Sequence, residues 1–163
     1  MSKHIIGVGN MPCSKDTINW KERLRILKLA SIKIKTPNAY DASGGSNMKL
    51  KLWSDSNANG LTSCIIDWIT LNGGSATRIN CTGLVRKING VTKYVPSSTR
   101  RGTADIHACI KGRHCSIEVK IGADSMSEYQ YNEQARITAA GGLYYVAKDM
   151  ASFVEWYSNS FHL

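Results

Sequence analysis

The chain lacks the features that mark membrane-spanning and secreted proteins. Its 163 residues contain no apolar run of about eighteen residues, the length that a helix needs to cross a bilayer. The sequence also shows no apolar signal segment and no repeat at a fixed period. We therefore expect no membrane partner and a location in the cytoplasm, which is the host cytoplasm if a virus encodes the chain.

Paired cysteines are also missing. The five cysteines are an odd number, and no two of them form a C-x-x-C pair. This disfavours a disulfide framework and predicts reduced, mostly buried thiols. A zinc site at Cys109, His114 and Cys115 is disfavoured too, because strand alternation places these two cysteines on opposite faces. The five are Cys13, Cys64, Cys81, Cys109 and Cys115.

Acidic residues are scarce relative to basic ones. The chain has 21 Lys and Arg against 12 Asp and Glu, a formal net charge of +9. Such an excess favours a polyanionic partner, because Lys and Arg contacts to phosphates release counterions. Residues 1–56 hold ten Lys or Arg and four acids, a net of +6, so most of the excess lies in the first third.

The composition predicts one globular domain preceded by a basic arm. An apolar content of 42% in 163 residues supports a real core. We place the arm at residues 1–46 and the domain at residues 47–163. Residues 17–35 predict a basic amphipathic helix with Trp20, Leu24 and Leu27 on one side, before a flexible stretch at residues 43–46. This helix has four open roles: gripping DNA, packing on the domain, covering a dimer partner, or lying solvated.

The most informative segment is residues 100–120, RRGTADIHACIKGRHCSIEVK. Apolar and polar residues alternate over residues 105–110 and again over residues 114–121, which predicts two strands with unlike faces. The apolar face holds Ile106, Ala108, Ile110, Cys115, Ile117, Val119 and Ile121. The polar face holds Asp105, His107, Ser116, Glu118 and Lys120.

A tight hairpin would bring the charged residues of this polar face together. A type II′ turn at Gly112 and Arg113 predicts His107 opposite Glu118 and Asp105 opposite Lys120. Two neighbouring carboxylates repel unless a cation lies between them, and carboxylate oxygens suit Mg²⁺ or Mn²⁺. A simpler interpretation is an ion pair between Asp105 and Lys120 on a solvated sheet face.

The motifs in this region resemble the VRR-NUC branch of the PD-(D/E)XK nucleases. They are G-T-A-D at residues 102–105, I-E-V-K at residues 117–120, S-x-x-Q at residues 127–130 and A-A-G-G at residues 139–142. The first motif of that family usually reads P-D, and Ala104 stands in place of the proline. The resemblance covers residues 57–157 and leaves the first third of the chain uncovered.

The resemblance implies a catalytic role for four residues. Asp105 and Glu118 would bind the metal with the Val119 carbonyl as a third ligand, and Lys120 would position the nucleophile. Gln130 would face the metal-bound water or the scissile phosphate. Ser127 and Gln130 also form the pattern of a capping box at a helix start, and both interpretations can hold.

Four further residues are candidates for DNA binding. Arg100 and Arg101 directly precede the aspartate motif and are well placed to hold a backbone phosphate. Arg78 lies on the preceding strand. His107 shares the predicted polar face with Asp105, although a lone strand histidine is more often a structural hydrogen-bonding group. Weaker candidates are Arg86, Lys87 and Lys93.

One acid that related resolvase-like nucleases carry, early in the helix before the catalytic sheet, is missing. Residues 57–62 read NANGLT and contain no carboxylate. A helical wheel places Asp67 off the apolar side, so we expect it to be exposed to solvent. Either one metal is sufficient, or Asn57, Asn59 or Thr62 fills the position of the acid.

The remaining pattern predicts an α/β fold with a restriction-endonuclease-like PD-(D/E)XK core, in the order α-β-β-β-α-β-α around a central mixed sheet. We expect helices at residues 61–72, 127–140 and 149–157 and strands at residues 75–81 and 143–147, besides the catalytic hairpin. A second hairpin at residues 85–95, with Asn89 and Gly90 at its turn, is inserted.

These features predict a divalent-metal-dependent DNA endonuclease. The resemblance implies branched substrates such as a Holliday junction or a flap, and a homodimer whose symmetry matches a junction. A noncatalytic DNA-binding or inhibitory protein with the same fold is the alternative, and the missing helix acid supports it. An RNA substrate is a third interpretation that only parallel assays can test.

Overall fold

The chain folds as a mixed α/β structure around a four-stranded sheet. The structure is a computed structural model that describes residues 19–80, 84–95 and 99–161. The strands of the sheet lie in the order β1-β4-β5-β6, and β2 and β3 form a separate two-stranded ribbon. The strands are β1 (Ser75–Arg78), β2 (Leu84–Ile88), β3 (Val91–Val95), β4 (Ile106–Ile110), β5 (Arg113–Val119) and β6 (Leu143–Ala147).

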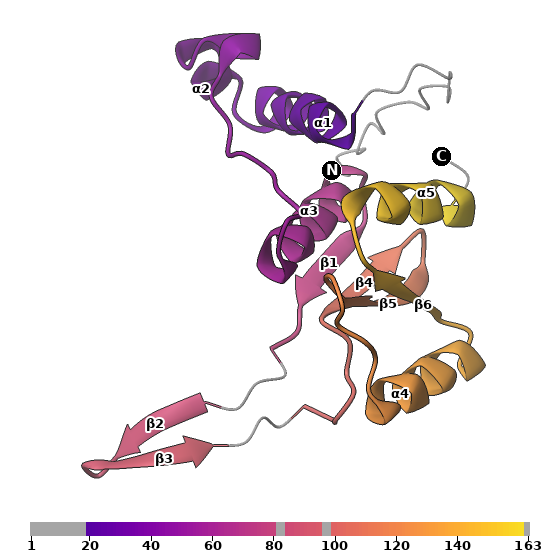
Figure 1. Cartoon of the computed structure of the whole chain (residues 1–163). Coiled ribbons are helices and arrows are strands. Elements are labelled where there is room, and N and C mark those ends of the chain that lie inside the picture. Colours follow the sequence, from indigo (N-terminus) through magenta and orange to yellow (C-terminus); the bar gives the residue numbers. More distant parts are fainter. Residues whose placement is uncertain (1–18, 81–83, 96–98, 162–163) are drawn as a thin grey trace, which may run out of the picture.

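Helices cover both faces of this sheet. Figure 1 shows α3 and α5 on one face, α4 on the other, and α1 and α2 beyond α3. The strand pairs β1·β4 and β4·β5 are antiparallel, whereas β5 and β6 run parallel, with α4 as the connection between them. The helices are α1 (Trp20–Lys35), α2 (Pro37–Ala42), α3 (Ala58–Leu71), α4 (Glu128–Ala139) and α5 (Met150–Phe161), with a 3₁₀ turn at Gly45–Asn47.

The predicted order of elements is confirmed from α3 onward. With the inserted ribbon set aside, the order is α-β-β-β-α-β-α. Helix α3 begins at Ala58, earlier than predicted, because the side chain of Asn57 caps it by accepting a hydrogen bond of 2.9 Å from the Gly60 amide. Strand β1 ends at Arg78, short of the predicted residue 81. Helix α5 runs to Phe161, beyond the predicted residue 157.

The hydrophobic core lies between the sheet and the pair α3 and α5. Ile106 and Ile117 at the centre of the sheet are fully buried. Trp68 of α3 meets Tyr157 of α5 edge to face, with ring centroids 6.5 Å apart. Phe153 of α5 is also fully buried and contacts Tyr157. The apolar face that the alternation predicts is therefore the core face.

The predicted register of the β4–β5 hairpin is wrong by two residues. The structure pairs Ile110 with Arg113 and His107 with Ser116, so the turn is formed by Lys111 and Gly112. His107 is therefore not opposite Glu118. Continued by one residue, the same register sets Asp105 beside Glu118, not Lys120. A shift of two residues keeps every side chain on its face, so the predicted polar and apolar faces stand.

The turn explains this difference. Lys111 and Gly112 both have positive φ, 47° and 79°, which is the conformation of a type I′ turn, not of type II′. A lysine adopts this left-handed conformation only at a cost of about 1 kcal/mol. The Lys111 ammonium donates a hydrogen bond of 2.8 Å to the Phe161 carbonyl at the end of α5. This contact offsets the strain and attaches the hairpin to α5.

Helix α1 packs on the body of the protein. Leu24 is fully buried and belongs to the same core as α3 and α5. The guanidinium of Arg23 lies over the Trp68 ring, 5.4 Å from its centroid. Of the four roles left open for this segment, packing on the domain is the one that residues 20–35 have here. The stretch at residues 43–46, expected to be flexible, contains part of a 3₁₀ turn.

The prediction of reduced, mostly buried thiols is confirmed in part. Cys64 and Cys115 are buried, as expected, whereas Cys109 is exposed; Cys13 and Cys81 lie outside the described residues. All three described thiols are free.

Across residues 19–80, 84–95 and 99–161, no helix is both long enough and apolar enough to span a membrane.

The core predicts a large effect for one truncation. Phe153→Ala removes a fully buried ring and is expected to lower the free energy of unfolding by about 3–5 kcal/mol. Urea unfolding followed by circular dichroism measures this loss. Leu52→Ala is the matched control, because the Leu52 side chain is 96% exposed and its removal should change stability by less than about 0.5 kcal/mol. Similar losses in both variants would contradict the assigned core.

Candidate active site

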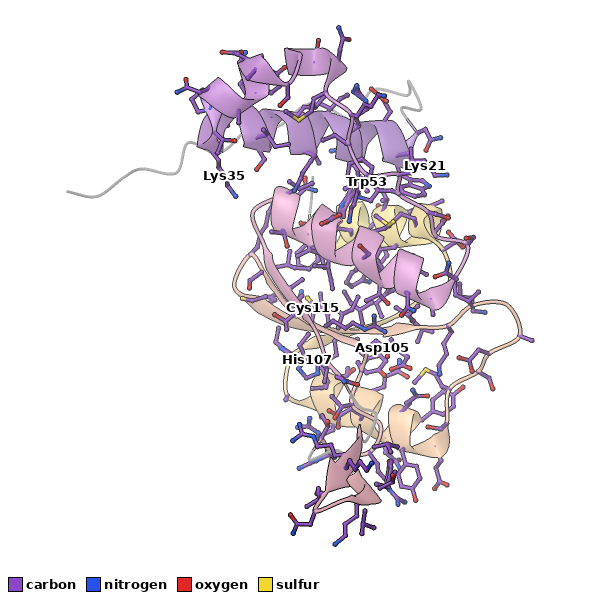
Figure 2. The ribbon with its side chains drawn as sticks, turned by 90° about the vertical axis from the view of Figure 1, so that its left-hand side faces the viewer. Lys21, Lys35, Trp53, Asp105, His107 and Cys115 are labelled. Carbon is purple, nitrogen blue, oxygen red and sulfur yellow. The ribbon has the colours of Figure 1, made fainter. Side chains whose placement is uncertain are left out.

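The polar face of the sheet is buried, contrary to the simpler interpretation of a solvated face. Ser116 is 0% exposed, Glu118 3% and Lys120 8%. Helix α4 covers this side, and Figure 2 shows Asp105 and His107 on it, with Cys115 toward α3. Burying charged groups is costly unless each finds a partner, so the contacts of these side chains are informative.

Asp105 directly precedes β4, and both its main chain and its side chain accept hydrogen bonds from backbone amides. Its main-chain carbonyl accepts a hydrogen bond of 2.7 Å from the Ile79 amide. Its carboxylate accepts one of 2.9 Å from the Val119 amide of β5. These two bonds fix the carboxylate beside the end of β5, where Glu118 lies on the same face.

Gly102 joins the aspartate segment to α4. Its φ is +82°, and a Cβ atom added there would lie 2.2 Å from the Tyr129 carbonyl oxygen. Only glycine allows this backbone to approach the first turn of α4 so closely. The glycine of the G-T-A-D motif therefore positions α4 against the segment that carries Asp105.

Gln130 has the capping role that the sequence predicts, and it also contacts Glu118. Its side-chain carbonyl accepts a hydrogen bond of 2.9 Å from the Ser127 amide, which is half of a capping box at the start of α4. Its amide nitrogen donates a hydrogen bond to the Glu118 carboxylate. One side chain thus begins the helix and contacts the site.

Glu118 is the centre of the cluster. One carboxylate oxygen accepts the Gln130 bond and lies 3.3 Å from the Lys120 ammonium, whereas the other, Oε2, is buried without a protein partner. Burial, followed by the nearby charge of Asp105, raises the pKa of Glu118 to about 7, although Lys120 acts in the opposite direction. A buried, unpartnered carboxylate oxygen beside a second carboxylate is a suitable ligand for a cation.

Lys120 follows the last residue of β5 and is held from two sides. Its amide donates a hydrogen bond of 2.9 Å to the Ala147 carbonyl of β6. Its ammonium lies 3.3 Å from Glu118 and 3.4 Å from the exposed carboxylate of Asp124. The ammonium therefore lies at the border between the buried carboxylates and solvent.

The donor set fits a hard divalent cation bound in part by water. Across the described residues, no three His, Cys, Asp or Glu side chains form a ready metal cluster. Asp105 and Glu118 would supply two carboxylates, which matches the one or two that Mg²⁺ uses when it keeps several waters. The predicted part of the Val119 carbonyl stays a prediction; the Val119 amide is the group that contacts Asp105.

The neutral residues proposed to replace the helix acid all have other hydrogen-bond partners. Asn57 caps α3, the Asn59 side chain accepts a bond of 2.8 Å from Arg78, and the Thr62 hydroxyl donates one of 2.7 Å to the Ala58 carbonyl. The start of α3 thus offers no carboxylate to the cluster.

Asp67 is not free in solvent, contrary to the prediction from the helical wheel. Its carboxylate lies 2.6 Å from the Lys51 ammonium and accepts a bond of 2.8 Å from the Trp53 indole. These contacts attach the segment before α3 to that helix. They explain the residue structurally, without a role in the site.

Two of the predicted DNA-binding arginines lie beside the start of α4. The Arg101 guanidinium lies over the Tyr129 ring, 5.5 Å from its centroid, and that ring is 53% exposed. Arg100 is exposed, and its charge helps to lower the pKa of Glu133 on α4, after the larger effect of Arg136. Arg78 is also exposed, but its side chain is bonded to Asn59 of α3.

His107 belongs to a neighbouring polar group and does not contact Glu118. Its ring meets that of His114 edge to face at 5.2 Å, and its Nε2 is buried without a protein partner. Burial, followed by the charge of His114, lowers the pKa of His107. Ser116 of β5 pairs with His107, and Tyr144 of β6 pairs with Ser116. The Tyr144 hydroxyl is also buried without a protein partner.

Four residues of this region were not found by sequence reasoning. Glu133 follows Gln130 by three residues, so helical spacing places both on the face of α4 toward the sheet. Asp124 follows Lys120 by four residues, a spacing suited to an ion pair. Tyr129 and Tyr144 gave no such signal, because an aromatic residue in a helix or strand is usually part of a core.

Comparisons of the chain with protein families, with curated proteins and with solved structures gave no match.

The contact at Gly102 predicts a large effect of a single methyl group. Gly102→Ala adds a backbone clash to the strain of a positive φ, so it should destabilise the protein much more than strain alone. Gly112→Ala is the matched control, since its φ is +79° and a Cβ atom added there would meet nothing within 4 Å. The control should lose about 1–2 kcal/mol in urea unfolding, and an equal loss in both variants would contradict the close approach to α4.

The raised pKa of Glu118 predicts a pH dependence of stability without metal. Between about pH 4.5 and 7 the unfolded chain releases this proton while the folded protein keeps it, so stability falls as pH rises through that window. Glu118→Gln should lack this fall. Urea unfolding in EDTA at several pH values measures both profiles, and their difference removes the contribution of His107. Parallel profiles would contradict the assignment.

Proposed function

We propose that this protein is a divalent-metal-dependent DNA endonuclease of the PD-(D/E)XK type, similar to the VRR-NUC branch. The observation that carries the proposal is one buried cluster. In it Glu118 contacts both Lys120 and Gln130, and the Asp105 carboxylate lies nearby, bonded to the Val119 amide and close enough to raise the pKa of Glu118. These four residues come from three separate motifs, and an ordinary ion pair would not need all of them.

The architecture supports the proposal. The order α3-β1-β4-β5-α4-β6-α5, with β4 and β5 as the hairpin and a parallel β6, is the arrangement that the resemblance implies. The motif residues lie at the start of β4, at the end of β5 and in the first turn of α4. Three element ends therefore meet at one place.

The cation would be Mg²⁺ or Mn²⁺, held by Asp105 and Glu118 with the Val119 carbonyl. When bound, such a cation activates water and neutralises charge that develops on a phosphate. Lys120, 3.3 Å from Glu118, would orient the nucleophile and stabilise negative charge beside it. Gln130 would hold the Glu118 side chain in place and face the scissile phosphate.

The proposed substrate is branched DNA, a Holliday junction or a flap. A homodimer would present two such sites with the symmetry of a junction. Arg100 and Arg101 would hold the backbone phosphate, since they lie on the segment that leads into Asp105. With no acid at the start of α3, we propose a single metal per site.

The alternative is a noncatalytic DNA-binding protein. Two observations favour it: α3 begins without an acid, and one Glu118 oxygen is already held by Gln130 and Lys120. Calorimetry separates the two functions. A pure binding module would show no Mn²⁺ binding that depends on Asp105.

The proposal predicts cleavage that requires both charged partners of the site. Asp105→Ala and Lys120→Ala should each reduce nicking of branched DNA by about a hundredfold or more, because the first removes a ligand of the cation and the second removes the ammonium beside the reacting phosphate. A panel of duplex, flap, fork and four-way junction DNA, with matched RNA and each divalent metal, measures activity and selectivity together.

The control for this experiment is Glu155→Gln, which removes an exposed carboxylate on α5, across the sheet from the site. It should cleave as the unaltered protein does. DNA binding should largely persist in all three variants. Cleavage by the Asp105 and Lys120 variants at the rate of the unaltered protein would refute the assignment. Preferential cleavage of RNA would change the proposed substrate from DNA to RNA.

A further inference from the structure

The ribbon of β2 and β3 takes no part in the main sheet. Its strands pair only with each other, from Leu84 opposite Val95 to Ile88 opposite Val91. Asn89 and Gly90 form its turn with φ of 53° and 81°, as the Asn-Gly pair predicts. Figure 1 shows the ribbon extending away from the sheet and its helices.

Both faces of this ribbon are open to solvent. Four large apolar side chains on it are 43% exposed or more: Val85, Ile88, Val91 and Tyr94. A two-stranded hairpin is at best marginally stable when nothing covers it. A surface of this kind is typical of an element that binds a partner.

The charge of the ribbon identifies the chemistry of that partner. Residues 84–95 contain Arg86, Lys87 and Lys93 and no acid. The acid-free stretch is longer, because no Asp or Glu occurs between Asp67 and Asp105, whereas six Lys and Arg do. The rest of residues 57–163 then carries 5 Lys and Arg against 8 acids, a net of −3, since the totals are 11 and 8. The basic surface of the domain is thus concentrated on the ribbon and its flanks.

One cross-strand pair of the ribbon also indicates an anionic partner. Arg86 and Lys93 are direct register partners, so their side chains share a face of the ribbon. Like charges placed directly opposite each other destabilise a hairpin. An anion lying against this face would remove the repulsion.

We propose that the β2–β3 ribbon enters the major groove of duplex DNA beside the cleavage position. The groove is about 12 Å wide and admits a two-stranded ribbon. Arg86 and Lys93 contact phosphates, and Ile88 and Val91, which lie on the same face of the ribbon, are directed into the groove. This proposal rests on the proposed function, and it makes the duplex arm of a branched substrate the part that the protein grips.

The geometry favours DNA over a second copy of the chain. Two ribbons brought together would combine +3 with +3 and no acid to pair with either. The chain also leads from the ribbon through Arg100 and Arg101 to Asp105, within about ten residues of β3. Arg100 and Arg101 thus lie along the chain between the ribbon and the candidate site.

The test is the salt dependence of duplex binding, measured in EDTA by fluorescence anisotropy with a labelled 30-base-pair DNA. Loss of two phosphate contacts should lower the slope of log K against log salt by about 2 in Arg86→Gln/Lys93→Gln. The matched control is Lys35→Gln/Lys49→Gln, which removes the same charge at two exposed positions outside the ribbon. Its slope should be nearly unchanged.

A second measurement tests the groove. Guanine N7 atoms in the major groove should be protected from dimethyl sulfate by the unaltered protein and lose this protection in the ribbon variant. Equal slopes in the two double variants would overturn the proposal. Protection of guanine N7 that persists in the ribbon variant would also overturn it. A ribbon variant that sediments as a monomer where the unaltered protein is a dimer, with no change in slope, would assign the ribbon to contact with a second copy of the chain. Because no metal is present, a protein that never cleaves DNA can still satisfy this proposal.

Discussion

The structure depends on burying one carboxylate, that of Glu118, under α4. A carboxylate at 3% exposure is unfavourable unless its surroundings offset the loss of water, and here an amide and an ammonium do so for one oxygen only. The other oxygen stays without a protein partner. The fold thus buries a titratable group whose pKa is raised, which is typical of sites that bind a cation or move a proton.

This constraint explains why the two faces of the sheet differ. The face toward α3 and α5 is a continuous apolar core, in which residues such as Ile117 and Phe153 are fully buried. The face toward α4 is polar, with Ser116 and Glu118 buried beneath the helix and Asp105 and His107 partly buried. Ile137 is the only buried apolar residue of α4. Polar contacts and the close approach at Gly102 therefore attach this helix to the rest of the protein.

Much of the fold was predictable from the sequence, because alternation and turn residues act locally. Asn89 and Gly90 specify their turn, and β6 begins and ends where its apolar run does. The register of the β4–β5 hairpin was not predictable. It depends on the Lys111 contact with Phe161, 50 residues further along the chain, which allows a lysine to adopt a positive φ.

The candidate site was likewise predictable only in part. The residues of the E-x-K motif and Asp105 meet because strand periodicity places them on one face, whatever the exact register. The burial of that face comes from α4, and so does the partnership of Arg101 with Tyr129. Neither the burial nor the contact of Arg101 with Tyr129 has a local sequence signal, because both depend on where α4 packs against the sheet.

The two bonds of Gln130 connect the start of α4 to the candidate site. Because the same side chain caps α4 and contacts Glu118, unwinding of the first helical turn would also remove the amide that contacts this carboxylate. A hydrogen bond donated by an amide favours the ionised form of a carboxylate. The first turn of α4 and the ionisation of the carboxylate beneath it are therefore coupled through one side chain.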